Sequence, residues 1–415
     1  MGKFAKYLPQ FGWDPIVLTV DKIKTKPQTL LSEVDEAKII RTPYFALSHF
    51  VLEKLRGNNN SFASSLQNIE HDSHQNGLFY KMITSLRFFY ARPEIRFFIE
   101  EPWGWYFHAV KRVLEVLKTQ KVDVIYSTYS TATSHLVASR LHNLTGVPWV
   151  AEFRDPWSFN QYAKKVQPFR FLEMQLEKQV IKGARYLVAI SKLLAEQLRE
   201  FHSKEVFVIP NGFDEEDYNQ VVPLTSKFTI TFTGNIYPGR RDPSALFKAV
   251  RDLYEERKVD EQNFEIGFFG ENSDVLYQLI NHYSVNHLVK IGGFVPYKES
   301  IIKQKESTIL LLLTWNDPRE WTYSGKVFEY LGARRPILAS VYRGGAMDEL
   351  INSTGCGAVA NNAEEIKSIL EKWINEWHEY KRIISFFEPK DEVIQGYTRK
   401  EQTNNLAKVL EKALL

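Results

Sequence analysis

The stretch Tyr323-Ser-Gly-Lys-Val-Phe-Glu-Tyr-Leu-Gly-Ala-Arg-Arg-Pro-Ile-Leu-Ala339 contains a loop, a helix, a tight turn and a strand in quick succession. Its apolar spacing predicts a helix over Gly325–Leu331, followed by a strand over Pro336–Ser340. The run Thr308–Leu313 just upstream is almost continuously apolar, which is typical of a strand buried on both faces of a parallel sheet. A strand, a helix and a second strand in this order indicate a parallel α/β unit.

The same alternation extends over most of the chain. Further strands are predicted at Pro15–Val20, Val122–Ser127, Pro148–Phe153, Tyr186–Ile190, Val206–Ile209, Phe228–Thr233, Phe264–Phe269 and Val289–Gly292. Further helices are predicted at Lys192–Phe201, Pro243–Glu256, Asp274–Tyr283, Lys298–Gln304 and Gly345–Ile351. We therefore predict the α/β class, with two Rossmann-like doubly wound parallel-sheet domains.

A turn-rich and acidic segment, Asn211–Ser226, marks the break between these domains. We place an N-terminal domain at residues 1–215, a C-terminal domain at 216–390 and a final helical segment at 391–415. The chain begins with a helical pattern, Lys3–Phe11, that Gly12 would cap. A Rossmann domain usually starts with a strand and a Gly-rich turn, so the first strand is expected to be missing from this sequence.

Composition excludes several classes of protein. Hydrophobic residues are 44% and charged residues 25% of the 415, which is typical of a globular chain and not of a disordered one. The net charge of +3 is too small to predict binding to nucleic acid. The lone Cys356 excludes an intramolecular disulfide, and no histidine spacing suits a metal. We expect no cofactor, no bound metal, and a cytoplasmic location because the start lacks a signal peptide.

Aromatic residues make up 14% of the chain, and many lie in the segment Phe79–Phe107 together with Lys and Arg. One interpretation is an interfacial surface that contacts the inner face of the plasma membrane or a lipid-linked substrate. The alternative is that the segment forms helices whose aromatic faces pack into a core.

Three segments carry candidate chemistry, and the first is the predicted helix that follows Ser324 and Gly325. Lys326 and Glu329 lie one turn apart on one helical face. Free N–H groups at the helix start and the lysine can meet a phosphate, while the carboxylate can accept two hydrogen bonds from adjacent ribose hydroxyls. The alternative is a Lys–Glu pair on a solvated surface.

The second segment is the loop after the strand Phe228–Thr233. Gly234 allows a ligand to approach the backbone closely, Asn235 follows it, and Arg240 and Arg241 can bind a diphosphate through charge-assisted hydrogen bonds. The alternative is an ordinary Pro-Gly turn with arginines on the surface.

The third set of candidates consists of two groups of residues, each at the end of a predicted strand in the first half of the chain. Arg154, Asp155 and Trp157 follow one strand, where the alternative to a site is an ion pair that orders a loop. The hydroxyl-rich run that includes Tyr126 and Ser127 precedes His135. These side chains are candidates for a sugar pocket, or simply for capping the next helix.

Together, the runs "PWVAEFRDPW", "ARYLVAISKLLAEQL", "VFVIPNGFD", "FTGNIYPGRRDP" and "SGKVFEYLGARRPILA" resemble the family-4 retaining glycosyltransferases, in a subgroup with "FRDPW". The resemblance implies the GT-B fold, in which two Rossmann-like domains face a cleft. It implies transfer of a hexose or related sugar from a nucleotide-sugar to a glycan or lipid-linked acceptor, without metal, in cell-surface polysaccharide synthesis. The second domain would bind the donor, the first the acceptor, and the terminal helix would cross back onto the first.

By the same resemblance, Glu329 matches the second glutamate of the family's Glu-x7-Glu motif and would hold the ribose. Lys326 with Arg240 or Arg241 would bind the diphosphate, and Gly234 matches the glycine of the donor loop. The sequence departs from the family where the first glutamate would fall at Trp321, and where Arg154 replaces a frequent histidine. The Gly-Gly loop of the first domain is also absent.

Two other functions remain open at this point. A nucleotide-sugar epimerase has the same architecture and would need acid/base residues, for which Glu152, Asp155 and His135 are the candidates. The second is a non-catalytic protein that binds a glycan or nucleotide. The shifted glutamate and the missing start are the features that suggest it.

Overall fold

The computed structural model describes residues 2–21, 33–44, 101–129, 131–160, 169–237, 241–271, 274–315, 317 and 323–415. The chain divides into two compact units. Unit 1 comprises Met1–Val208 with Leu406–Leu415, and unit 2 comprises Ile209–Asn405.

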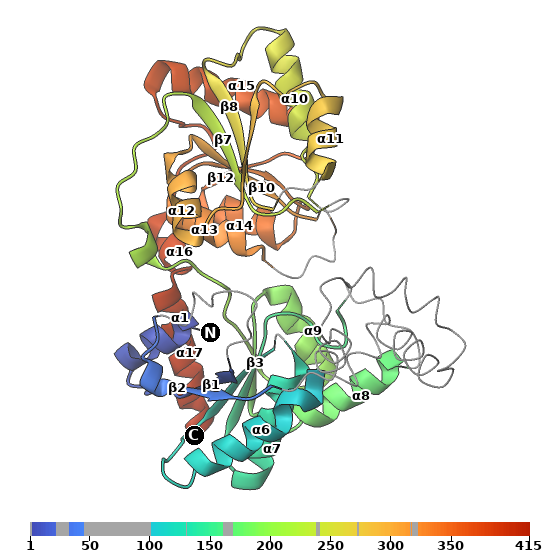
Figure 1. Cartoon of the computed structure of the whole chain (residues 1–415), viewed down its shortest axis with the longest axis vertical. Coiled ribbons are helices and arrows are strands. Elements are labelled where there is room, and N and C mark those ends of the chain that lie inside the picture. Colours follow the sequence, from blue (N-terminus) through green and yellow to red (C-terminus); the bar gives the residue numbers. More distant parts are fainter. Residues whose placement is uncertain are drawn as a thin grey trace, which may run out of the picture. The chain divides into compact units, whose positions relative to one another are not determined.

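Unit 2 is built on a parallel sheet, which has six strands within the described ranges (Figure 1). The strands are β7 (Phe228–Thr233), β8 (Phe264–Phe269), β9 (Val289–Gly293), β10 (Ile309–Leu313), β11 (Ile337–Ser340) and β12 (Gly357–Val359). They are ordered β9-β8-β7-β10-β11-β12, so the direction in which strands are added reverses between β7 and β10. Open α/β sheets bind ligands at the carboxyl ends of the strands beside such a reversal.

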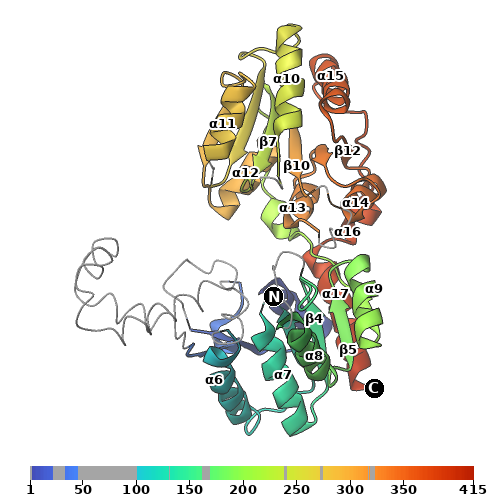
Figure 2. The ribbon, with the colours of Figure 1, turned by 90° about the vertical axis from the view of Figure 1, so that its right-hand side faces the viewer.

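Both faces of this sheet are buried, as the continuous apolar strands predict. Ile309, Leu311 and Leu313 of β10 point into one core, and Leu310 and Leu312 point into the other. The first core lies under α10 (Ser244–Glu255), α11 (Asp274–His282) and α15 (Ala363–Tyr380) (Figure 2). The second lies under α12 (Tyr297–Glu306), α13 (Gly325–Ala333) and α14 (Ala346–Thr354). This arrangement is doubly wound.

Unit 1 contains a four-stranded parallel sheet in the part of the chain that is described. Its order is β3 (Ile125–Tyr129), β4 (Trp149–Phe153), β5 (Tyr186–Ala189) and β6 (Val206–Val208). Its longer helices are α6 (Glu101–Val116), α7 (Ala132–Thr145), α8 (Phe169–Ile181) and α9 (Lys192–His202). A separate parallel pair consists of β1 (Val17–Val20) and β2 (Ile39–Thr42).

The start of the chain is helical, as predicted. It forms α1 (Gly2–Tyr7) and a 3-10 turn, Leu8–Phe11. Gly12 ends this turn with φ of 80°, and its N–H donates to the carbonyls of Leu8 and Pro9. The positive φ is the reason that glycine is suited to this cap.

The last helix, α17 (Arg399–Leu414), runs from unit 2 into unit 1 along the sequence. Its apolar residues Leu406, Val409, Leu410 and Ala413 are buried. Lys412 pairs with Glu205 at 2.6 Å and lies over the rings of Tyr186 and Phe207. Residues 406–415 therefore complete unit 1.

Most of the aromatic segment Phe79–Phe107 lies outside the described residues. Of its described end, Trp105 and Tyr106 pack against α7 residues, and Trp105 Nε1 donates to Thr42 Oγ1 at 2.6 Å. Phe107 is 64% exposed. Contact with a membrane stays a prediction. Among the described helices, none has both the length and the apolar character needed to cross a bilayer.

Candidate active site

The loop that follows β7 lies at the reversal point of the unit 2 sheet. Gly234 has φ of 150°, and its N–H donates to the carbonyl of Phe269, the last residue of β8, at 2.7 Å. Asn235 Oδ1 accepts from the Glu271 N–H at 2.9 Å. A side chain at Gly270 would meet the Gly234 carbonyl oxygen at 2.1 Å, so the two loops pack backbone against backbone. The loop after β7 is thus fixed to the loop after β8.

Helix α13 brings Lys326 beside this loop. A Cβ placed on Gly234 would lie 3.7 Å from Lys326 Cε. Lys326 Nζ is 2.9 Å from Glu329 Oε2, and both side chains are partly exposed. The Lys–Glu pair that was one alternative is therefore formed, and it lies at the reversal point of the sheet. Ser324 is the N-cap residue of α13 and Gly325 its first residue, so the free N–H groups of the helix lie next to Lys326.

Gln304 of α12 connects these two segments, and sequence reasoning did not single it out. Its Nε2 donates to Glu329 Oε2 at 2.9 Å and to Thr233 Oγ1 at 3.0 Å. The Thr233 N–H donates in turn to the Tyr330 hydroxyl at 3.3 Å. Burial raises the pKa of Tyr330 to about 12, so the hydroxyl keeps its proton at neutral pH. The end of β7 is therefore hydrogen-bonded to both α12 and α13.

Arg241 supplies a second cation near this loop. Its Nη1 donates to the Asn235 carbonyl at 3.1 Å, and its guanidinium lies 5.1 Å from the centre of the Tyr237 ring. Its positive charge also opposes the rise in the pKa of Tyr330 that burial causes. Arg240 lies outside the described residues, as do Glu320 and Trp321.

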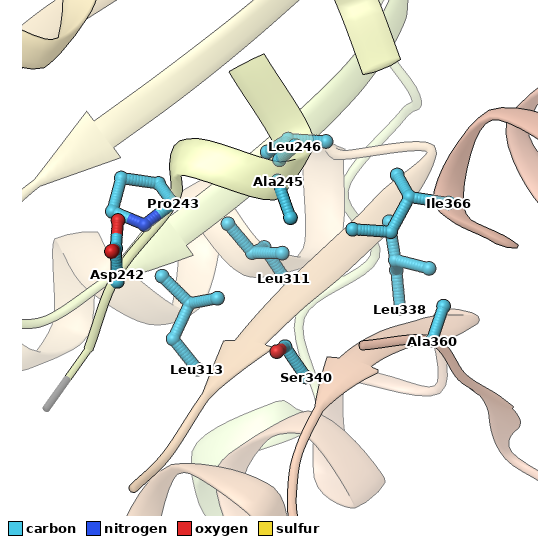
Figure 3. Close-up of a pocket in the computed structure, with 10 residues that line it drawn as sticks. All are labelled: Asp242, Pro243, Ala245, Leu246, Leu311, Leu313, Leu338, Ser340, Ala360 and Ile366. Atoms are coloured by element: carbon cyan, nitrogen blue, oxygen red, sulfur yellow. The ribbon is translucent and has the colours of Figure 1, made fainter. Parts of the chain in front are cut away.

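A small cavity nearby is not this site. It measures about 10 Å³ and lies between the start of α10 and strands β10 and β11. In Figure 3, Asp242 and Pro243 lie on one side of the cavity and Leu338 and Ile366 on the other, with Leu311 between them. A volume of that size holds one water at most, so the cavity is a packing defect of the core.

In unit 1 the structure brings Ser127, His135 and Trp157 together inside the core. The Ser127 hydroxyl and His135 Nδ1 are 2.8 Å apart, and Trp149 Nε1 donates to the same hydroxyl at 2.7 Å. Trp157 lies 6.3 Å from the His135 ring, and both side chains are fully buried. Burial, with a smaller effect from His202, lowers the pKa of His135 to about 3. The neutral ring serves as a polar core residue here.

Tyr126 points to the opposite face of the same sheet. Its strand neighbour Ser127 faces the core described above, and side chains alternate along a strand. Burial and the nearby Glu152 carboxylate raise the pKa of Tyr126, while Arg154 opposes the rise. Desolvation likewise raises the pKa of Asp155, again against Arg154. Tyr126, Glu152, Arg154 and Asp155 therefore form one polar cluster on β3 and β4. Arg154 and Asp155 follow the carboxyl end of β4, as predicted, whereas Tyr126 is the second residue of β3 and not at its carboxyl end.

Comparison with known proteins gives a partial family match and a clear fold. The family model for Glycosyltransferase Family 4 matches residues 70–217. A glycosyltransferase from Rickettsia africae ESF-5 is 15% identical, with a TM-score of 0.62 over 99% of this chain and 93% of that one. HepE from Anabaena, in complex with UDP and glucose, is 16% identical, with a TM-score of 0.54 over 73% and 81%. The search of curated proteins finds no match.

A third structure is sucrose-phosphate synthase from Thermosynechococcus elongatus. It is 11% identical, with a TM-score of 0.53 over 74% of this chain and 77% of that one. These proteins consist of two Rossmann-like domains, as this chain does. The chain has the GT-B fold. The predicted α/β class with two Rossmann-like parallel-sheet domains is therefore confirmed.

Proposed function

We propose that this GT-B protein is a glycosyltransferase that moves a hexose or related sugar from a nucleoside diphosphate sugar to a glycan or lipid-linked acceptor. The observation that carries the proposal is the cluster of Gly234, Lys326 and Glu329 at the reversal point of the unit 2 sheet. Two comparisons support it. These are the family-4 match over residues 70–217 and the UDP and UDP-glucose complexes of HepE.

The donor end of the reaction needs positive charge rather than an acid or a base. A nucleoside diphosphate leaves as an anion, so cations and helix N–H groups aimed at it stabilise the transition state. Lys326, Arg241 and the start of α13 are the groups that supply this in unit 2. Glu329 accepts hydrogen bonds from the ribose, and Arg240 is proposed as a further phosphate ligand. Transfer with retention and without metal is part of the proposal.

The acceptor is proposed to bind unit 1. Arg154 and Asp155 follow the carboxyl end of β4, where parallel sheets bind ligands, and they share a polar cluster with Tyr126 of β3. Ser127, His135 and Trp157 lie behind these strands in the core, where they hold the cluster in place. The acceptor's proton passes to a phosphate oxygen of the donor, so no side chain has to act as base. We place the activity in cell-surface polysaccharide synthesis in the cytoplasm, with peripheral contact at the inner face of the plasma membrane.

A panel of nucleotides and nucleotide-sugars tests this proposal. UDP or GDP at 100 times its Kd should stabilise the protein by about 2.7 kcal/mol in thermal unfolding. The matching nucleotide-sugar should release its nucleoside diphosphate faster when a lipid-linked or glycan acceptor is added.

The other outcomes identify the alternatives. Stabilisation without turnover would indicate a non-catalytic binding protein. Conversion of the sugar without release of nucleotide would indicate an epimerase. Failure of every nucleoside diphosphate to stabilise the chain would refute the proposal.

A further inference from the structure

Gln304 is a fully buried polar side chain that the reaction described above does not use. Its amide NH2 group has two hydrogens, and the two acceptors at 2.9 and 3.0 Å, Glu329 Oε2 and Thr233 Oγ1, use both of them. A carboxylate can only accept, so it fixes the NH2 end of the amide toward Glu329. Gln304 therefore ties the carboxylate of α13 to the last residue of β7.

This bond matters most when Lys326 turns toward a ligand. In the structure Glu329 Oε2 accepts from both Lys326 and Gln304, at 2.9 Å each. A lysine that binds phosphate gives up its bond to the carboxylate. Gln304 then keeps one hydrogen bond to Glu329, so the partly buried carboxylate still has a hydrogen-bond donor. Because an amide does not titrate, the Gln304 donor is present at every pH.

The bond also limits how Glu329 can turn. Both bonds fall on Oε2, which leaves Oε1 as the oxygen that can accept from a ligand. A carboxylate held in one orientation distinguishes a ribose with two adjacent hydroxyls from a sugar that lacks one of them. Without the amide, the carboxylate is free to rotate and to stay paired with Lys326.

We propose that Gln304 is a positioning residue that sets the preference of the nucleotide site for a ribonucleoside diphosphate over its 2′-deoxy form. This rests on the proposed function, because the preference exists only if unit 2 binds a nucleoside diphosphate at Glu329.

The test uses Gln304→Met, which keeps the length of the side chain and removes both hydrogen bonds. Affinities are measured by calorimetry on the full chain, for UDP or GDP, whichever binds, and for its 2′-deoxy form. The wild type should prefer the ribonucleotide by about 10-fold or more, because a hydrogen bond to a charged group has that effect. In Gln304→Met this preference should fall to about 3-fold or less, because the ribonucleotide loses affinity and the 2′-deoxy form loses little.

Gln402→Met is the matched control. Gln402 is also a buried glutamine of unit 2, only 2% exposed, and its Nε2 donates to the Gly396 carbonyl and not to the candidate site. This variant should keep the wild-type preference. If Gln304→Met does not fold, Gln304→Leu also removes both hydrogen bonds, and it should lose the preference as well.

Three results overturn the inference. One is a wild type that binds both nucleotides equally. Another is a Gln304 variant that keeps the preference, or that loses affinity for both nucleotides by the same factor, as a merely structural residue would. The last is a wild type that binds no nucleoside diphosphate, and only this result also counts against the proposed function.

Discussion

Replacing Gly234 with alanine tests whether the loop after β7 needs a glycine in order to receive a ligand. At φ of 150° an L-residue is strained, which costs about 1–3 kcal/mol. The added methyl group would lie 3.5 Å from the Phe232 ring and 3.7 Å from Lys326 Cε. These are ordinary contact distances, so overlap adds nothing to the strain. The unfolding transition of unit 2 should move down by about 2–4 °C for each kcal/mol.

Nucleotide binding should weaken in addition to the loss of folding stability. The methyl group points toward Lys326, the side on which a phosphate would approach both the lysine and the loop backbone. We expect the Kd for UDP or GDP to rise by at least about 10-fold, which is about 1.4 kcal/mol. Calorimetry of unfolding and of nucleotide binding gives both quantities from the same preparation.

Gly12→Ala is the control for strain alone. Gly12 has φ of 80°, a Cβ there would meet no atom within 4 Å, and it belongs to unit 1. It should lose stability without losing affinity for nucleotide. A Gly234→Ala protein that unfolds earlier yet binds nucleotide like the wild type would refute the reasoning, because the loop would then be strained but not part of the site.

Three further changes test the rest of the site and the unit 1 core. Glu329→Ala should raise KM for the donor by about 10–100-fold with little change in kcat, since it removes charged hydrogen bonds to the ribose; a fall in kcat alone would contradict this role. Arg241→Ala should chiefly lower kcat, and an unchanged turnover with the true donor would exclude it from the phosphate site. His135, with its pKa lowered to about 3, favours the folded state while neutral, so this stability is complete above pH 6.5 and is lost as the pH falls toward 3. The free energy of unfolding in urea should therefore drop less between pH 7 and pH 5 in His135→Gln than in the wild type, and the exposed His287→Gln should behave like the wild type.

The strands that sequence predicted best are those whose burial shows in their composition. β7 and β8 have the predicted bounds, and β10 differs by one residue, because apolar runs closed by Gly or polar residues delimit them. Two strands were missed, β2 and β12, which are four and three residues long. Strands this short show no alternation of apolar and polar residues that could be recognised in the sequence. They form because β1 pairs with β2 and β11 pairs with β12.

β3 was predicted over Val122–Ser127 and lies at Ile125–Tyr129. Its hydroxyl-rich end resembles a loop in sequence, yet it pairs with β4 as far as Phe153. The Ser127–His135 contact follows from this shift, because the serine lies within the strand and faces the core. Tertiary pairing overrode local polarity here.

Some residues of the candidate site could be predicted from the sequence, and one could not. Gly234, Lys326 and Glu329 could be picked out because each residue type has a chemical reason to follow a strand end or to start a helix. Gln304 could not, because its partners Glu329 and Thr233 are 25 and 71 residues away in the sequence. A glutamine on an ordinary polar helix carries no local signal. Only the fold shows that it links two segments of the site.

Helix α17 has a consequence for the order in which the chain can fold during synthesis. Unit 1 stops at Val208 and resumes at Leu406, with the whole of unit 2 between them. At 5–20 residues per second, the ribosome needs about 10–40 s to make that intervening stretch. During this time the surface of unit 1 that Lys412 and its neighbouring apolar residues later cover has no partner. Unit 1 can therefore reach its complete native form only after the last residues of the chain have been made.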